Sequence, residues 1–103
     1  MEITITKTQE KTVICVNGRV DSANYQLLET KIDEIIESGE TSLLIDCKNL
    51  NYISSAGLRT FLVGLKKVKS LNGTLELANL QSKIKELFDL SGFSNLFSFI
   101  TTE

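Results

Sequence analysis

Residues 43–68 read LLIDCKNLNYISSAGLRTFLVGLKKV, and this stretch decides the fold class. It begins with the apolar run Leu43 to Ile45, which is typical of a buried strand. A polar interval with two adjacent serines, Ser54 and Ser55, follows. Apolar residues then return at helical spacing from Leu58 to Val68. The stretch therefore predicts a buried strand, a loop and an amphipathic helix in succession.

The rest of the chain repeats this alternation. Strand patterns cover 2–6, 12–16, 74–78 and 97–100, and helical spacing begins at Ser22 and again at about Gln81. Asp21 is predicted to cap the first helix, while Ser38–Gly39, Asn72–Gly73 and Ser91–Gly92 are predicted to end the three helices. Asn17–Gly18 is predicted to end the second strand. We expect a single α/β domain over residues 1–103. Its mixed, mostly parallel sheet has four to five strands, with an N-terminal hairpin and three to four packed helices.

The composition narrows the function classes. Hydrophobic residues make up 42% and charged residues 23% of the chain, and the formal net charge is -2. A weakly acidic chain is a poor match for nucleic acid, which requires a basic surface. No apolar run approaches the roughly 20 residues of a membrane helix, and no signal peptide is recognised. We expect a cytoplasmic protein with neither nucleic acid nor membrane as a partner.

The chain contains no histidine, which removes the usual general base and the usual metal ligand. Cys15 and Cys47 stand in apolar runs without the spacing of a metal or redox site, so both are predicted to be buried structural cysteines. Ser82 and Lys85 fit the short S-x-x-K pattern, but its partner motifs are missing. The glycines are scattered singly rather than gathered in a phosphate loop. We therefore expect no enzyme activity, no metal and no cofactor.

The predicted topology brings two distant loops together. In a parallel sheet, the loops that leave the C-terminal ends of the strands share one edge. These loops here are 17–22 and 48–55. Asp21 should therefore lie near Ser54 and Ser55.

The adjacent serines allow three interpretations. A helix cap explains one of them and is worth about 0.5–2 kcal/mol. A nucleophile needs a base, and no histidine is present to act as one. A modification site explains the second serine, because a phosphate adds about -1.5 to -2 charge at a helix N-terminus that tolerates it. The residues alone do not decide which of the two serines is the cap and which is modified.

Three motifs in order resemble one known family. Leu44-Ile45-Asp46 followed by Ile53-Ser54-Ser55-Ala56-Gly57-Leu58-Arg59 is similar to the core of STAS domains, the anti-sigma factor antagonists of bacteria. Gly18-Arg19-Val20-Asp21 resembles the family's G-x-x-D segment. Residues 86–93 resemble its late helix ending at a glycine. The motifs and their spacing cover essentially the whole chain.

The resemblance implies a function by partner switching. Unphosphorylated members bind an anti-sigma factor that is also a serine kinase, which releases a sigma factor. The kinase then phosphorylates a serine of the antagonist and ends the binding, and a serine phosphatase resets it. ATP and Mg²⁺ belong to the kinase, so the antagonist holds no cofactor.

The resemblance also implies the site residues. The acceptor two positions before the motif glycine is Ser55, with Ser54 as second choice. With Ser55 as the acceptor, the predicted helix cap is Ser54. The residues implied to contact the partner lie on the same edge: Val20, Asp21, Asn24, Ser54, Ser55, Gly57, Leu58 and Arg59. One alternative is a constitutive STAS adaptor in a transport or signalling complex, without a phosphoserine switch. Another is a small hydrolase or lipid-binding protein.

Overall fold

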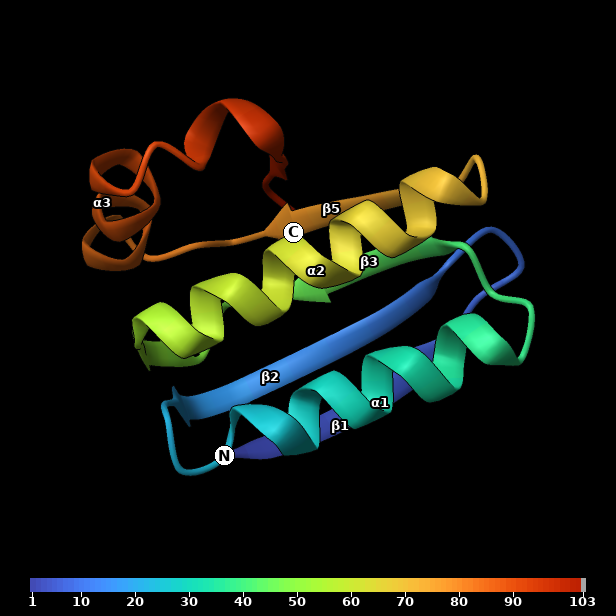
Figure 1. Cartoon of the computed structure of the whole chain (residues 1–103), viewed down its shortest axis with the longest axis horizontal. Coiled ribbons are helices and arrows are strands. Elements are labelled where there is room, and N and C mark those ends of the chain that lie inside the picture. Colours follow the sequence, from blue (N-terminus) through green and yellow to red (C-terminus); the bar gives the residue numbers. More distant parts are fainter. Residues whose placement is uncertain (103) are drawn as a thin grey trace.

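A computed structural model describes residues 1–102 of the chain. Figure 1 shows strands and helices alternating along the sequence. The elements are β1 (Glu2–Lys7), β2 (Thr12–Val20), α1 (Tyr25–Glu37), β3 (Ser42–Asp46), β4 (Leu50–Ile53), α2 (Ser55–Ser70), β5 (Thr74–Ala78), α3 (Ser82–Leu90), a short 3₁₀ helix (Ser94–Leu96) and β6 (Ser98–Ile100).

The strands form one mixed sheet. Their order is β1-β2-β3-β5-β6, and β4 pairs with β2 beside this path. β1 and β2 are antiparallel and form the predicted N-terminal hairpin, whereas the other pairs are parallel. The predicted α/β class with a mixed, mostly parallel sheet is confirmed, and the short last strand is β6.

Two local predictions around β2 are wrong. Asn17–Gly18 does not end this strand, which continues through a bulge between Gly18 and Arg19 to Val20. Residues 12–15 pair with β3, and residues 18–20 pair with β4. The predicted loop 48–55 contains β4, a sixth strand. Its exposed central residues lie between buried Leu50 and Ile53, so the segment shows neither alternation nor an apolar run.

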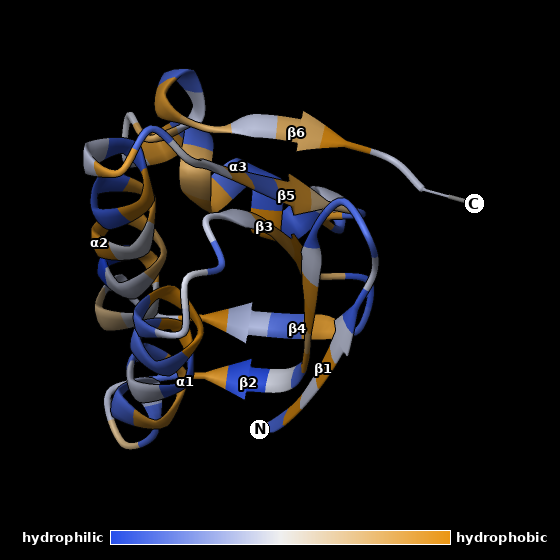
Figure 2. Cartoon of the chain, turned by 90° about the vertical axis from the view of Figure 1, so that its right-hand side faces the viewer, coloured by the Kyte–Doolittle hydropathy of each residue, from blue (hydrophilic) through white to orange (hydrophobic). Residues whose placement is uncertain are grey.

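α1 and α2 pack side by side on one face of the sheet (Figures 1 and 2). The predicted apolar faces of both helices turn inward onto buried strand residues, as the hydropathy colours of Figure 2 show. α3 packs against β4. Its fully buried Phe88 contacts the rings of Phe61, Phe97 and Phe99 at centroid distances of 5.6–6.1 Å. The core comprises Ile14, Val16, Leu28, Ile32, Leu43, Ile45, Phe61, Leu65, Val68, Leu75, Leu77 and Phe88, among others.

The predicted helix ends are confirmed. After α1, the Gly39 N–H donates to Ile36 O at 3.0 Å and the Glu40 N–H to Ile35 O at 3.2 Å. This reversal places Gly39 at φ +100°, a conformation that glycine adopts without strain. At the end of α2 the corresponding residue is Asn72, with φ 61°. α3 ends at Ser91–Gly92 in the same way.

The two cysteines differ in burial. Cys47 is fully buried, as predicted, but Cys15 is only half-buried. The reason is its place on β2: Cys15 pairs with Asp46 of β3 and alternates with the fully buried Ile14 and Val16, so it faces away from the helices. The pKa of each thiol lies above its usual value. Burial is the larger cause of the raised pKa, and the nearby Asp46 carboxylate is the next.

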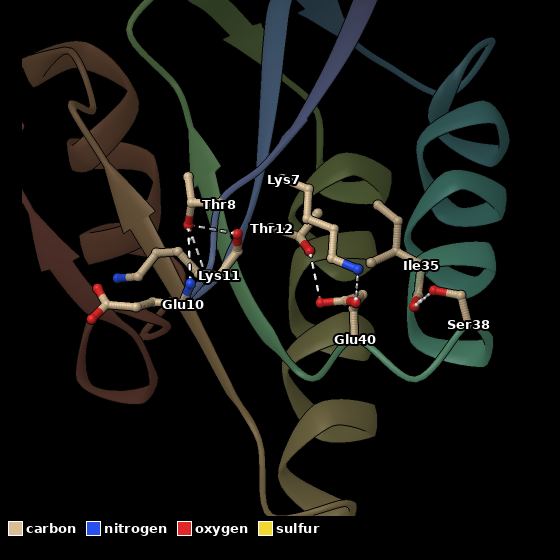
Figure 3. Close-up of polar contacts among 8 residues, drawn as sticks. All are labelled: Lys7, Thr8, Glu10, Lys11, Thr12, Ile35, Ser38 and Glu40. Carbon is tan, nitrogen blue, oxygen red and sulfur yellow. Dashed lines mark hydrogen bonds and ion pairs between the residues drawn. The ribbon is translucent and has the colours of Figure 1, made fainter.

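Glu40 joins the helical layer to the hairpin at the opposite end from the helix N-termini. It follows α1, and its carboxylate oxygens contact Lys7 Nζ at 2.6 Å and the Thr12 hydroxyl at 3.2 Å (Figure 3). The hydrogen bond from Lys7 is the main reason that the pKa of Glu40 lies below its usual value. The contact ties the end of α1 to both strands of the β1–β2 hairpin.

Candidate functional site

The C-terminal ends of β2 and β4 lie side by side and position the candidate site. Val20 and Ile53, the last residues of these strands, are paired. The Ser54 N–H then donates to Val20 O at 2.9 Å. The expectation that Asp21 and the serine pair share one edge of the sheet is therefore confirmed. We call this surface, formed by Arg19, Asp21, Asn24, Tyr52, Ser54, Ser55 and Arg59, the serine edge.

Ser54 is the N-cap of α2, as predicted. Its backbone is extended, with φ -88° and ψ 174°, and its hydroxyl accepts a hydrogen bond from the Gly57 N–H at 3.3 Å. Its carbonyl accepts the first helical bond from the Leu58 N–H at 2.9 Å. Ser54 is half-buried, and its side chain already has a structural task.

Ser55 is the first residue of α2 and is exposed. Within residues 1–102 its hydroxyl makes no hydrogen bond. The first turn of α2 holds no acidic side chain. An added anion there would meet backbone N–H groups that have no helical partner, together with the positive end of the helix dipole. Ser55 therefore presents an exposed hydroxyl at the N-terminus of α2.

Three of the predicted contact residues are buried, which corrects the expectation that they present a surface. Val20 is 0% and Leu58 6% exposed, and both belong to the core. Gly57 is buried because α2 begins directly over the strand ends. A Cβ at this position would lie 2.7 Å from Ile53 Cγ1 and 2.8 Å from Val20 Cγ1. These residues hold the serine edge in place from below.

Asp21 does not cap α1, contrary to the prediction. The helix begins only at Tyr25, and the Asp21 carboxylate instead accepts from the Ala23 N–H at 3.0 Å and the Asn24 N–H at 3.2 Å. Residues 22–24 form a turn before the helix, and the Asp21 carboxylate caps this turn instead of α1.

Asn24 fastens this loop from the other side. Its side chain accepts from the Asp21 N–H at 2.9 Å and donates to Arg19 O at 3.0 Å. Both residues lie half-exposed on the serine edge, where their mutual bonds give the loop a defined shape.

Arg19 and Tyr52 are surface residues of this edge that the sequence reasoning did not single out. They are paired across β2 and β4, and the Arg19 guanidinium lies 4.2 Å from the centre of the Tyr52 ring. Arg19 Nε is also 3.8 Å from Asp21 Oδ2. The signal that reveals them is the parallel register of residues 18–20 with 50–53, which required β4 to be recognised as a strand.

Arg59 lies one turn after Ser55 on α2 and is exposed. Residues four apart on a helix are surface neighbours. Among the residues that the structure describes, Arg59 makes no ion pair and no side-chain hydrogen bond. The serine edge therefore presents an uncompensated guanidinium beside an unbonded hydroxyl.

The serine edge carries hydroxyl, carboxylate, amide, phenol and guanidinium groups. The chain has no histidine, and residues 1–102 contain no cluster of histidine, cysteine or carboxylate side chains that could hold a metal ion. Over the same residues, no helix combines the length and apolar character needed to cross a bilayer.

Proteins of similar sequence are named as anti-sigma factor antagonists. A bacterial relative from Bordetella bronchiseptica, the candidate anti-sigma factor antagonist BtrV, is 36% identical over 97 residues, which cover 94% of this chain and 84% of the relative. The anti-sigma-B factor antagonist of Bacillus subtilis is 33% identical over 98 residues, or 93% of this chain and 89% of that protein.

Solved structures show the same fold. A candidate anti-sigma factor antagonist from Thermotoga maritima superposes with a TM-score of 0.92 at 17% identity, over 97% of this chain and 86% of that one. Phosphorylated SpoIIAA of Bacillus gives a TM-score of 0.79 at 20% identity, over 99% and 92% of the two chains. The family model described as the STAS domain matches residues 2–103. The chain therefore belongs to the STAS domain family.

Proposed function

We propose that this protein is an anti-sigma factor antagonist that works by partner switching. In its unphosphorylated form, the serine edge binds an anti-sigma factor that is also a serine kinase, and the bound sigma factor is released. Phosphorylation of Ser55 ends the binding, and a serine phosphatase restores it. The protein acts in the cytoplasm, has no catalytic role in the switch and holds no cofactor of its own.

One observation carries this proposal: the adjacent serine hydroxyls differ in their hydrogen bonding. The Ser54 hydroxyl caps α2, whereas the exposed Ser55 hydroxyl is unbonded within residues 1–102. Two relatives above 30% identity bear names of anti-sigma factor antagonists. SpoIIAA, which shares the fold, has been solved in unphosphorylated and phosphorylated forms. These facts support Ser55 as the acceptor and the serine edge as the docking surface.

The phosphoryl transfer needs only a hydroxyl from this chain. The Ser55 Oγ attacks the γ-phosphorus of ATP held by the kinase, the bond to ADP breaks, and the hydroxyl proton passes to a base of the kinase. The product carries an added charge of about -1.5 to -2 at the centre of the docking surface. A loss of roughly 3 kcal/mol in the contact weakens binding about a hundredfold, which is sufficient to exchange partners.

Direct contacts are assigned to the accessible members of the predicted set: Asp21, Asn24, Ser54, Ser55 and Arg59. Arg19 and Tyr52 extend the same surface and join the proposal.

The test is phosphorylation by the cognate anti-sigma factor kinase with Mg²⁺ and ATP, followed by intact-mass and peptide mass spectrometry. The wild-type chain and Ser54→Ala should each gain one phosphate on Ser55, whereas Ser55→Ala should gain none. Full phosphorylation of Ser55→Ala would show that the acceptor is misassigned.

The constitutive adaptor makes the opposite prediction for binding. It requires Ser55→Asp to bind the partner as tightly as the wild-type chain does. Loss of binding on this substitution, with binding kept by Ser55→Ala, would exclude it.

A further inference from the structure

The serine edge carries both arginines of the chain, Arg19 and Arg59. They differ in what surrounds them. The Arg19 guanidinium lies over the Tyr52 ring at 4.2 Å, and its Nε is 3.8 Å from Asp21 Oδ2. Arg59 is exposed, and among residues 1–102 its guanidinium has no carboxylate oxygen within 4.0 Å. A new anion on this edge could therefore pair with Arg59, whereas Arg19 already contacts Tyr52 and Asp21.

Arg59 also has the right place relative to Ser55. The two residues are four apart in α2, which begins at Ser55, so their side chains leave the same face of the helix. An acidic group placed four residues before a cation is the more favourable order of such a pair. A guanidinium binds phosphate oxygens through parallel N–H donors, which makes arginine better suited than lysine to this contact.

We propose that Arg59 is the intramolecular ligand of the phosphate on Ser55. The inference rests on the proposed function for its biological setting, though not for its chemistry. Before phosphorylation, the Arg59 guanidinium is available to an acidic group of the partner. After phosphorylation, it turns to the phosphate of its own chain. The modification thus adds negative charge to the docking surface and also withdraws the surface's free cation from the partner.

The experiment uses the full chain with phosphoserine placed at position 55 by genetic code expansion, so that no kinase is needed. Phosphorus-31 NMR follows the resonance from pH 4.5 to 8.5 at about 0.1 M salt. A phosphomonoester exchanges its second proton near pH 6. An adjacent guanidinium favours the dianion, so the wild-type midpoint should lie about half a pH unit below that of Arg59→Gln. Arg59→Lys should fall between them, because lysine keeps the charge without the paired donors.

The matched control is Lys66→Gln, which removes the same charge from an exposed position of the same helix, about 16 Å from Ser55 along the helix axis. Its midpoint should equal that of the wild-type chain, since this separation exceeds the Debye length at 0.1 M salt. Equal midpoints for the wild-type chain and Arg59→Gln would overturn the proposal. So would an equal rise in Lys66→Gln, which would indicate a general charge effect.

Failure of this proposal is distinguishable from failure of the proposed function. If the kinase phosphorylates Ser55 and the NMR midpoints coincide, the switch stands and Arg59 has no part in holding the phosphate. If no kinase modifies Ser55 but the midpoints differ as stated, the contact exists and the proposed function is wrong.

Discussion

At the scale of single residues, two adjacent serines have separate tasks because the backbone gives them separate positions. Ser54 has the extended conformation of an N-cap, and its oxygen is aimed at the Gly57 N–H. Ser55 is the first residue of the helix and is exposed. One hydroxyl stabilises α2, and the other remains open to solvent and to a partner.

This difference predicts unequal effects on stability. Ser54→Ala should lower the free energy of unfolding by about 1 kcal/mol, because the Gly57 N–H loses its acceptor. Ser55→Ala should change it by less than about 0.5 kcal/mol, since an exposed hydroxyl without a partner is removed. Urea titration followed by circular dichroism measures both values. Equal losses in the two variants would contradict the assigned cap.

The sequence allowed Ser54 to be recognised as the cap, since a serine before a helical apolar pattern has a local cause. Arg19 and Tyr52 could not be recognised in the same way. Their contact depends on the register of β2 with β4, which are more than 30 positions apart. Asp21 was predicted to cap α1, but the intervening turn 22–24 directs its hydrogen bonds to Ala23 and Asn24 instead.

At the scale of elements, the serine edge exists because α2 begins directly on the ends of β2 and β4. Gly57 permits this contact, since any larger residue would place its Cβ inside the contact distance of Val20 and Ile53. Gly64, two turns later in the same helix, faces Ile32 of α1 with more room. A substitution at Gly57 therefore tests close packing, whereas a substitution at Gly64 tests mainly helix propensity.

Gly57→Ala should lower the free energy of unfolding by about 1–3 kcal/mol, because the new methyl group would lie 2.7–2.8 Å from two buried side chains. Gly64→Ala is the matched control. Its Cβ would lie 3.3 Å from Ile32 Cγ2, and the gain of roughly 1 kcal/mol in helix propensity offsets this smaller crowding. Thermal and urea unfolding compare the variants. A Gly64→Ala loss as large as that of Gly57→Ala would refute the close contact at the serine edge.

The element order was predictable from apolar periodicity, but β4 was not. Its sequence exposes Asn51 and Tyr52 between two buried ends, and a four-residue segment offers too little pattern to identify a strand. Only the partner strand shows why it forms: β2 extends past β3 and leaves residues 18–20 for β4. Such pairings depend on tertiary structure, beyond what a single short segment encodes.

At the scale of the whole molecule, Glu40 links the helical layer to the hairpin at the end opposite the serine edge. The hydrogen bond from Lys7 lowers the pKa of Glu40 in the folded state relative to the unfolded chain. A lowered carboxylate pKa contributes stability above the unfolded value, which is near 4.3, and this stability is lost as pH falls through the folded value.

Acid should therefore destabilise the wild-type chain more steeply than Glu40→Gln, which cannot titrate at this position. The difference should be constant near neutral pH and shrink as pH falls below about 4.5. Urea unfolding at a series of pH values between 3 and 7 measures it. A difference that does not change with pH would show that the Glu40 carboxylate is not held by Lys7.

The serine edge rests on the buried residues Val20, Gly57 and Leu58. We propose that a phosphate on Ser55 controls binding at this edge. The most direct test is isothermal titration calorimetry of the cognate anti-sigma factor against the same chain, unphosphorylated and fully phosphorylated on Ser55. The Kd of the phosphorylated chain should be about a hundredfold higher. Equal affinities for the two forms would contradict this proposal.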